Sequence, residues 1–175
     1  MLLGLLSLTG QAAYGADAEV PKEYQIKAAF LYNFTKFVEW PAARFASASS
    51  PIVIAVLGEN PFGDELAKLV KGRRVNGREI VIKSVTDTSE ADSVHVLFIC
   101  ARNDRQLGPA LAQLRADAVL TVGESAAFAS AGGVITFTLV EDKVRFEINQ
   151  AAGEQAGLKI SSQLLKLAVP ARPKN

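Results

Sequence analysis

The stretch GENPFGDE at residues 58–65 has the glycine spacing of a phosphate-binding P-loop. It follows an apolar run and precedes a helical pattern, which is the context that a P-loop requires. A P-loop continues with a lysine and a serine or threonine, which bind the phosphates and the magnesium ion, but Asp64 and Glu65 stand at those positions. Two carboxylates at a helix start complement the helix dipole and repel a phosphate. The sequence therefore excludes a nucleoside triphosphate site at this loop.

The residues needed for nucleophilic or metal catalysis are almost absent. Residues 123–127 (GESAA) match the nucleophile elbow G-x-S-x-G except at Ala127. A catalytic serine also needs a base, and the single histidine, His95, opens an apolar strand, where we expect a buried structural ring. The single cysteine, Cys100, ends the apolar run VHVLFICA, so we expect a buried structural thiol and no disulfide within the chain. No Cys/His cluster has zinc-site spacing, and we predict no enzyme, metal or cofactor.

Two loop segments remain as candidate ligand-binding sites. Both directly follow predicted strands, and ligands of open α/β sheets bind in the crevice outside the carboxyl ends of the strands. Because the first loop is acidic, we expect a neutral or cationic small molecule. The candidate residues are Asn60, Pro61, Phe62, Glu124 and Phe128.

A run of basic residues lies between a predicted helix and the strand that follows it. These residues are Lys68, Lys71, Arg73, Arg74 and Arg78, with no acidic residue between them. Two interpretations stay open: a solvated link, or a docking patch for an acidic partner or an anionic membrane surface. The net charge of the whole chain is only +1, which gives no electrostatic case for binding nucleic acid.

The elements that must position these residues alternate between strand and helix patterns. Strands are predicted at 52–57, 79–85, 94–100, 118–122, 134–140 and 143–149, and helices at 61–70, 107–115, 124–131, 149–157 and from 161 or 162 onward. Glu141-Asp142 forms the turn of a C-terminal β-hairpin. The 175 residues suit one domain. We predict an α/β fold, with a mixed, mostly parallel sheet flanked by helices.

A helix is also predicted before Pro41, in the aromatic stretch AAFLYNFTKFVEWP at residues 28–41. One broad apolar arc holds Ile26, Phe30, Leu31, Phe34, Phe37 and Val38, with Tyr32 and Thr35 on the opposite side. We therefore expect Phe30, Phe34 and Phe37 in the core. Lys27 and Asn33 interrupt this arc, so we expect the Lys27 ammonium to reach outward and Asn33 to bond the main chain.

The two ends of the chain are predicted to lie outside the domain. Residues 1–18 combine an apolar segment, too short to span a bilayer, with small residues, so we predict a cleaved signal peptide. Ala16-Asp17-Ala18 and Ala13-Tyr14-Gly15 both fit the cleavage pattern. The domain is expected at 19–170, and the polar residues 171–175 form a frayed tail.

Three long segments resemble the YfiR family of bacterial periplasmic proteins. They are YQIKAAFLYNFTKFVEWP (24–41), GGVITFTLVEDKVRFEIN (132–149) and AGLKISSQLLKLA (156–168). The resemblance implies an α/β regulator without catalytic activity, which represses an inner-membrane diguanylate cyclase by binding its periplasmic sensor region and so controls cyclic di-GMP signalling and biofilm behaviour.

The resemblance also implies further partners. An outer-membrane lipoprotein can sequester such proteins, some form homodimers, and some carry disulfides that respond to redox state; with Cys100 alone, this chain cannot form a disulfide within itself. A different function stays open beside this one, namely a periplasmic sensor that binds a small ligand and acts on another membrane signalling partner.

Overall fold

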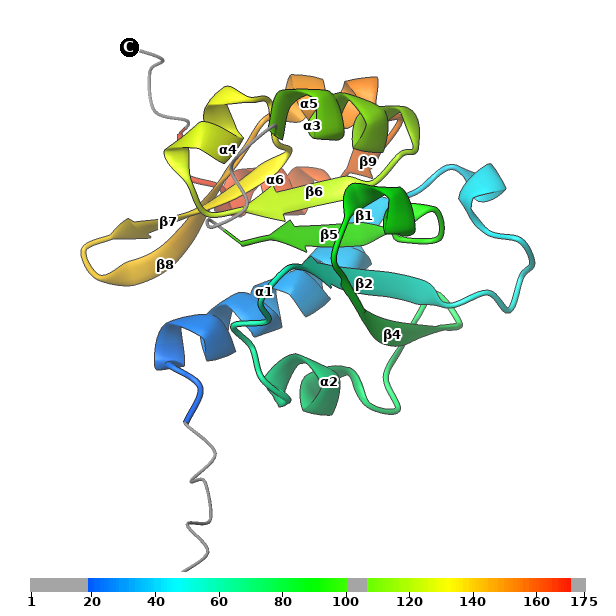
Figure 1. Ribbon diagram of the computed structural model, residues 1–175, viewed down its shortest axis with the longest axis horizontal. Coiled ribbons are helices and arrows are strands. Elements are labelled where there is room, and N and C mark those ends of the chain that lie inside the picture. Colours follow the sequence, from blue (N-terminus) through cyan, green and yellow to red (C-terminus); the bar gives the residue numbers. More distant parts are fainter. Residues whose placement is uncertain (1–18, 101–106, 171–175) are drawn as a thin grey trace, which may run out of the picture.

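The computed structural model describes residues 19–100 and 107–170 (Figure 1). The predicted signal peptide and the predicted tail lie outside the described residues.

A mixed sheet of seven strands forms the centre of the molecule, in the order β3-β4-β2-β5-β6-β7-β8. The strands are β2 (Ile52–Leu57), β3 (Arg74–Val75), β4 (Arg78–Val85), β5 (Val96–Ile99), β6 (Leu120–Gly123), β7 (Ile135–Val140) and β8 (Lys143–Ile148). The five inner strands run parallel, and β3 and β8 pair antiparallel at the edges. A separate antiparallel pair joins β1 (Val38–Glu39) to β9 (Lys159–Ile160). The predicted fold class, including the β7–β8 hairpin, is confirmed.

Helices cover both faces of this sheet. They are α1 (Lys22–Phe37), α2 (Glu65–Val70), α3 (Leu107–Ala116), α4 (Ala126–Ser130), α5 (Gln150–Gln155) and α6 (Ser162–Leu167), with short 3₁₀ turns η1 (Ala42–Arg44) and η2 (Thr88–Ala91). Buried side chains of α1, α2, α5 and α6 belong to the apolar cluster on one face, and those of α3, α4 and η2 to the cluster on the other. Because helices lie on both faces, β2, β5 and β6 are buried along their whole lengths. The apolar sequences of β2 and β5 predicted this burial, whereas β6 contains the buried Thr121, whose hydroxyl accepts from the Val134 N–H at 3.1 Å.

The buried side of α1 differs from the predicted arc. Phe34 is fully buried, as predicted, and Phe30 and Phe37 are partly buried against the same core. However, Ile26 is exposed, whereas Tyr32 and Thr35 are buried. α1 packs against α2 as well as against the sheet, and this second contact rotates the buried side by roughly a quarter-turn. The Thr35 hydroxyl is satisfied within the helix, since it donates to the Tyr32 carbonyl at 2.6 Å.

The prediction that Asn33 bonds the main chain is wrong. Its Oδ1 accepts from Lys36 Nζ at 3.1 Å, at the surface of the molecule. The rotation of the buried side explains this, because it places Asn33 towards solvent, where an amide needs no main-chain partner.

Candidate functional site

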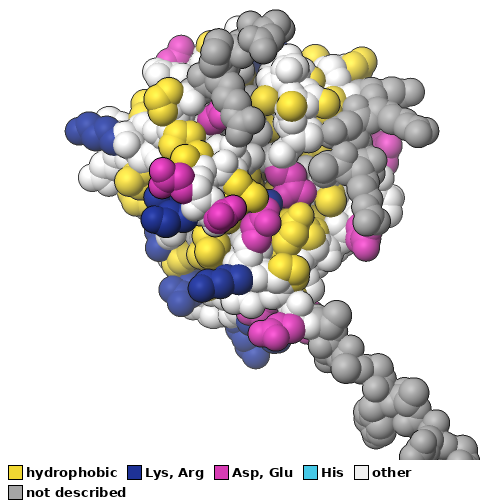
Figure 2. Space-filling model, turned by 90° about the vertical axis from the view of Figure 1, so that its left-hand side faces the viewer, with side chains coloured by type: hydrophobic (Ala, Val, Ile, Leu, Met, Phe, Trp, Pro, Cys, Tyr) yellow, Lys and Arg dark blue, Asp and Glu magenta, His cyan; other side chains and the backbone are white. Residues whose placement is uncertain are grey.

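The carboxyl ends of the parallel strands meet at one edge of the sheet, which Figure 1 shows on the left and Figure 2 shows face on. After β2 the chain continues to β4, on one side of β2, and after β5 it continues to β6, on the other side. The direction in which strands are added to the sheet therefore reverses between β2 and β5. A reversal of this kind opens a crevice where open α/β sheets bind ligands. Figure 2 shows acidic side chains among hydrophobic ones near the middle of this edge.

Side chains from the beginning of α1 occupy the space beside this edge. The Tyr24 ring meets the Phe62 ring edge-on, with centroids 5.7 Å apart. The Tyr24 hydroxyl donates to Glu124 Oε1 at 3.1 Å. Phe62 belongs to the loop after β2 and Glu124 follows β6, so one tyrosine links the ends of two strands.

Lys27 is buried beside Tyr24, which corrects the prediction that its ammonium reaches outward. The side chain is 5% exposed, and Nζ lies 2.6 Å from Glu124 Oε2. Nζ also bonds Glu23 and lies 4.5 Å from the centroid of the Tyr24 ring. An ammonium buried without partners would be very costly, and two carboxylates satisfy it here. Glu124 lies 97 positions further along the chain, so the sequence pattern of α1 gave no sign of this partner.

The charges around Tyr24 indicate a structural role for this cluster rather than a role in proton transfer. Burial, together with the adjacent Glu124 carboxylate, raises the pKa of Tyr24 well above its ordinary value. The phenol therefore keeps its proton and acts as a hydrogen-bond donor. Lys27, Tyr24 and Glu124 satisfy one another, and their arrangement joins α1 to the sheet.

The structure separates the five candidate ligand residues. Phe62 and Glu124 both contact Tyr24. Asn60 instead shapes its own loop, because its side chain accepts from the Phe62 N–H at 2.9 Å and donates to the Gly63 carbonyl at 3.0 Å. This turn also delays the start of α2 to Glu65.

The other two candidates lie apart from this contact. Pro61 is partly buried within the same loop as Asn60. Phe128 belongs to the apolar cluster on the opposite face of the sheet, where its ring packs on Gly123 and Gly133. Binding of a small ligand by these five residues stays a prediction.

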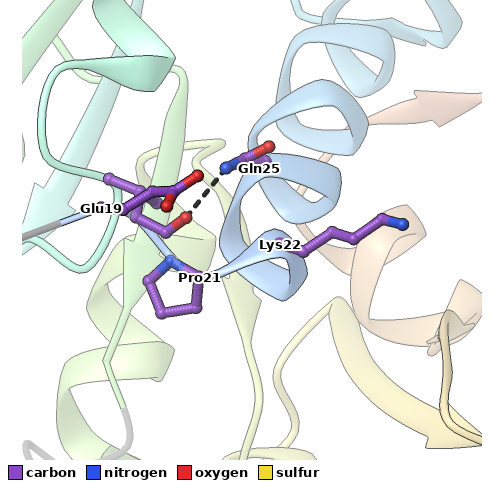
Figure 3. Close-up of a pocket in the computed structure, with 5 residues that line it drawn as sticks. Glu19, Pro21, Lys22 and Gln25 are labelled. Atoms are coloured by element: carbon purple, nitrogen blue, oxygen red, sulfur yellow. Dashed lines mark hydrogen bonds between the residues drawn. The ribbon is translucent and has the colours of Figure 1, made fainter.

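A surface depression lies on the segment that leads into α1 (Figure 3). It is lined by Glu19, Val20, Pro21, Lys22 and Gln25, and the Gln25 amide donates to the Val20 carbonyl at 2.8 Å. Glu19 and Lys22 carry opposite charges, so this set of side chains does not select a particular ligand charge.

His95 is buried at the opposite end of the sheet, as its place in an apolar run predicted. Its Nδ1 accepts from the Val53 N–H at 3.1 Å, and its ring stacks on Phe45 with centroids 4.5 Å apart. Burial and the positive charge of Arg44 lower the pKa of His95 to about 4. The ring is therefore neutral at physiological pH and contributes to packing.

Acid should destabilise the protein through His95. The unfolded ring has a pKa near 6.5 and the folded ring one of about 4, so between these values the unfolded state binds more protons and stability falls as the pH falls. The expected loss is on the order of 2–3 kcal/mol. In His95→Asn, an amide oxygen replaces Nδ1 as the acceptor. The free energy of unfolding of this variant, measured with urea at pH 7, 5 and 4, should therefore lose this part of its pH dependence. If the natural chain and His95→Asn had the same pH dependence of unfolding, the lowered pKa of His95 in the folded protein would be contradicted.

Arg74 and Arg78, two of the five basic residues, bind polar groups around the β3–β4 turn and in the loop before β2. Arg74 pairs with Glu79 at 2.6 Å. Arg78 donates to the carbonyls of Ser47 and Ser50, at 2.9 and 2.7 Å, and stacks on Phe45. Arg74 therefore stabilises the turn between β3 and β4, whereas Arg78 joins the start of β4 to the loop before β2.

The remaining basic residues form a surface with a lysine of α1. We call this surface the basic face, and it consists of Lys36, Lys68, Lys71 and Arg73. Lys36 Nζ and the Arg73 guanidinium lie 4.1 and 5.1 Å from the centroid of the Tyr32 ring. Hydrogen bonding from Arg73 and Lys36 lowers the pKa of Tyr32. Sequence reasoning missed Lys36, because α1 and the link after α2 meet only in the folded chain.

Within residues 19–100 and 107–170, no three His, Cys, Asp or Glu side chains gather as a metal site would require. Cys100 is a free, partly buried cysteine at the end of β5. In the same part of the chain, no helix combines the length and the apolar character needed to cross a bilayer.

The sequence pattern of the YfiR/HmsC-like family matches residues 24–169, which is most of the chain. This chain belongs to that family. The match spans the main sheet, the Lys27–Glu124 pair and the basic face, and it confirms the resemblance seen in the three sequence segments. The family indicates a periplasmic regulator of diguanylate cyclase signalling rather than an enzyme.

Solved structures show the same fold. One is a conserved domain protein from Vibrio cholerae O1 biovar El Tor strain N16961, with a TM-score of 0.53 and 12% identity. The alignment covers 85% of this chain and 60% of that one. Comparison with curated proteins gives no match.

Proposed function

We propose that this protein is an exported repressor that binds the periplasmic sensor region of an inner-membrane diguanylate cyclase and keeps cyclic di-GMP low. The observation that carries this proposal is the family match over residues 24–169. The structure is compatible with a protein that acts by contact, since the polar residues at the carboxyl edge bind one another.

The basic face is the surface that we propose for the cyclase. In the described residues, Lys36, Lys71 and Arg73 form no ion pair, and Lys68 has one long pair with Glu65, at 3.4 Å. Positive charge is therefore unbalanced here, and an acidic segment of the partner complements it. Contact of Lys36 and Arg73 with the Tyr32 ring limits their motion before binding, which lowers the entropy lost on docking.

The outer-membrane lipoprotein and the homodimer stay predictions of the family resemblance. The alternative function, a small-ligand sensor, has less support, because Tyr24 and Lys27 fill the space between Phe62 and Glu124.

Deleting the gene tests the proposal. Loss of a repressor should raise cellular cyclic di-GMP several-fold, and the full-length chain should restore the low level. A chain without residues 1–18 should fail to restore it, because the protein would stay on the wrong side of the membrane. Full restoration by the shortened chain would contradict action in the periplasm.

A further inference from the structure

α1 has little local stabilisation at its start beyond the bond from the Gln25 amide to the Val20 carbonyl, at 2.8 Å. The residue before it, Pro21, makes no side-chain capping bond, although the first amides of a helix lack partners within the helix. Lys22, Gln25 and Ile26 are exposed, so Tyr24, Lys27 and the buried Ala28 hold the first two turns to the domain. Their stability must come from tertiary contacts.

Those contacts converge on Glu124. Its two oxygens accept from the Tyr24 hydroxyl and from Lys27 Nζ, at 3.1 and 2.6 Å. Glu124 itself is firmly placed between β6 and α4, and α4 is capped by Ser125, whose hydroxyl accepts from the Phe128 N–H at 3.0 Å. One carboxylate on a rigid support therefore holds Tyr24 and Lys27 at the start of a helix that has no side-chain cap.

Loss of this carboxylate leaves Lys27 with only Glu23, which lies on the same helix turn and is 39% exposed. A buried ammonium with one half-exposed partner is unfavourable, whereas water solvates it fully. Because Lys27 and Glu23 belong to the same segment, they reach water together when that segment moves away. The rest of α1, which includes the buried Leu31 and Phe34, has apolar contacts that hold it in place.

We propose that Lys22–Lys27 is a clasp, which opens from the carboxyl edge as a unit while the sheet and the rest of α1, from the buried Ala28 onward, stay folded. Opening withdraws Tyr24 from the Phe62 ring and Lys27 from the Phe137 ring, which lies 5.8 Å from Nζ. The parts of the Phe62 and Phe137 rings that Tyr24 and Lys27 cover then become accessible. The clasp provides a place where a signal can act on the protein, and it does not depend on the proposed partner.

Hydrogen exchange of the purified protein, followed by mass spectrometry, tests the clasp. In the natural chain, the hydrogen-bonded amides of Gln25 to Lys27 should exchange at least tenfold faster than those of Leu31 to Phe37. Glu124→Gln keeps the side-chain shape but removes the charge, and it should speed exchange of the clasp amides by a further tenfold or more. Amides of β2 and β5 should keep their slow exchange.

The control is Glu154→Gln, which changes an exposed glutamate whose side chain accepts from the Gln150 amide, and it should leave the exchange rate of every amide unchanged. Two results would overturn the proposal. One is equal exchange along the whole of α1 in the natural chain, a measurement that does not depend on the folding of any variant. The other is a uniform acceleration across α1 and the sheet in Glu124→Gln, which would show global destabilisation.

Discussion

Gly133→Ala should lower the free energy of unfolding by about 3 kcal/mol or more. A Cβ atom at this position would overlap the Phe128 ring. That ring is only 1% exposed and also packs on Gly123, so it has no free space to move into. Overpacking of a rigid, buried contact forces the backbone to shift, which explains the large expected cost.

Urea unfolding measures this effect, with Gly108→Ala as the matched control. Gly108 lies in α3, and a Cβ there meets nothing within 4 Å. The control should change stability by less than about 1 kcal/mol, because the helix preference of alanine is opposed by the restriction that Pro109 places on the residue before it. If Gly133→Ala were as stable as the natural chain, the packing of Phe128 described above would be wrong.

Phe34→Ala should cost about 3–5 kcal/mol of stability. Its side chain is fully buried, and its ring packs against Phe30, Phe137 and Phe146 with centroids 5.2–6.1 Å apart. Removing the ring loses these contacts and leaves a cavity between α1 and the sheet.

Phe37→Ala is the control for this prediction. Phe37 lies one turn later in α1 and is partly exposed, so its loss should cost no more than about half as much. Equal midpoints for the two variants in urea unfolding would contradict the observed orientation of α1 and would favour the arc predicted from sequence.

The sheet was largely predictable from sequence. β2 and β5 are buried on both faces and every residue in them is apolar, so such a run is visible in the sequence without knowledge of its neighbours. The β7–β8 hairpin was also visible, because Glu141-Asp142 interrupts two alternating strands.

The orientation of α1 was not predictable in the same way. Hydrophobic periodicity shows which side of a helix is most apolar, but α2 determines that Tyr32 and Thr35 are buried. The position of Lys27 depends on Glu124, which is remote in sequence and forms no local pattern. Pairs of this kind depend on tertiary structure, so single-sequence reasoning places such a lysine at the surface.

The run of basic residues between α2 and β4 was also only partly predictable from sequence. Five basic residues in one link suggested one patch, yet Arg74 bonds Glu79 and Arg78 bonds the loop before β2. The partners of Arg78 are carbonyls about 30 positions earlier, and carbonyl positions cannot be read from side-chain types. Conversely, Lys36 joins the surface because α1 lies beside the link after α2.

The most direct test of the account is cellular cyclic di-GMP in a deletion strain that carries charge-reversed basic-face variants. Lys71→Glu with Arg73→Glu should fold and be exported but leave cyclic di-GMP as high as in the deletion strain. Lys83→Glu, which changes an exposed lysine on the opposite face of the sheet, should restore the low level of the parent. Restoration by the double variant would contradict docking through the basic face, and equal cyclic di-GMP in the deletion and parent strains would contradict repression itself.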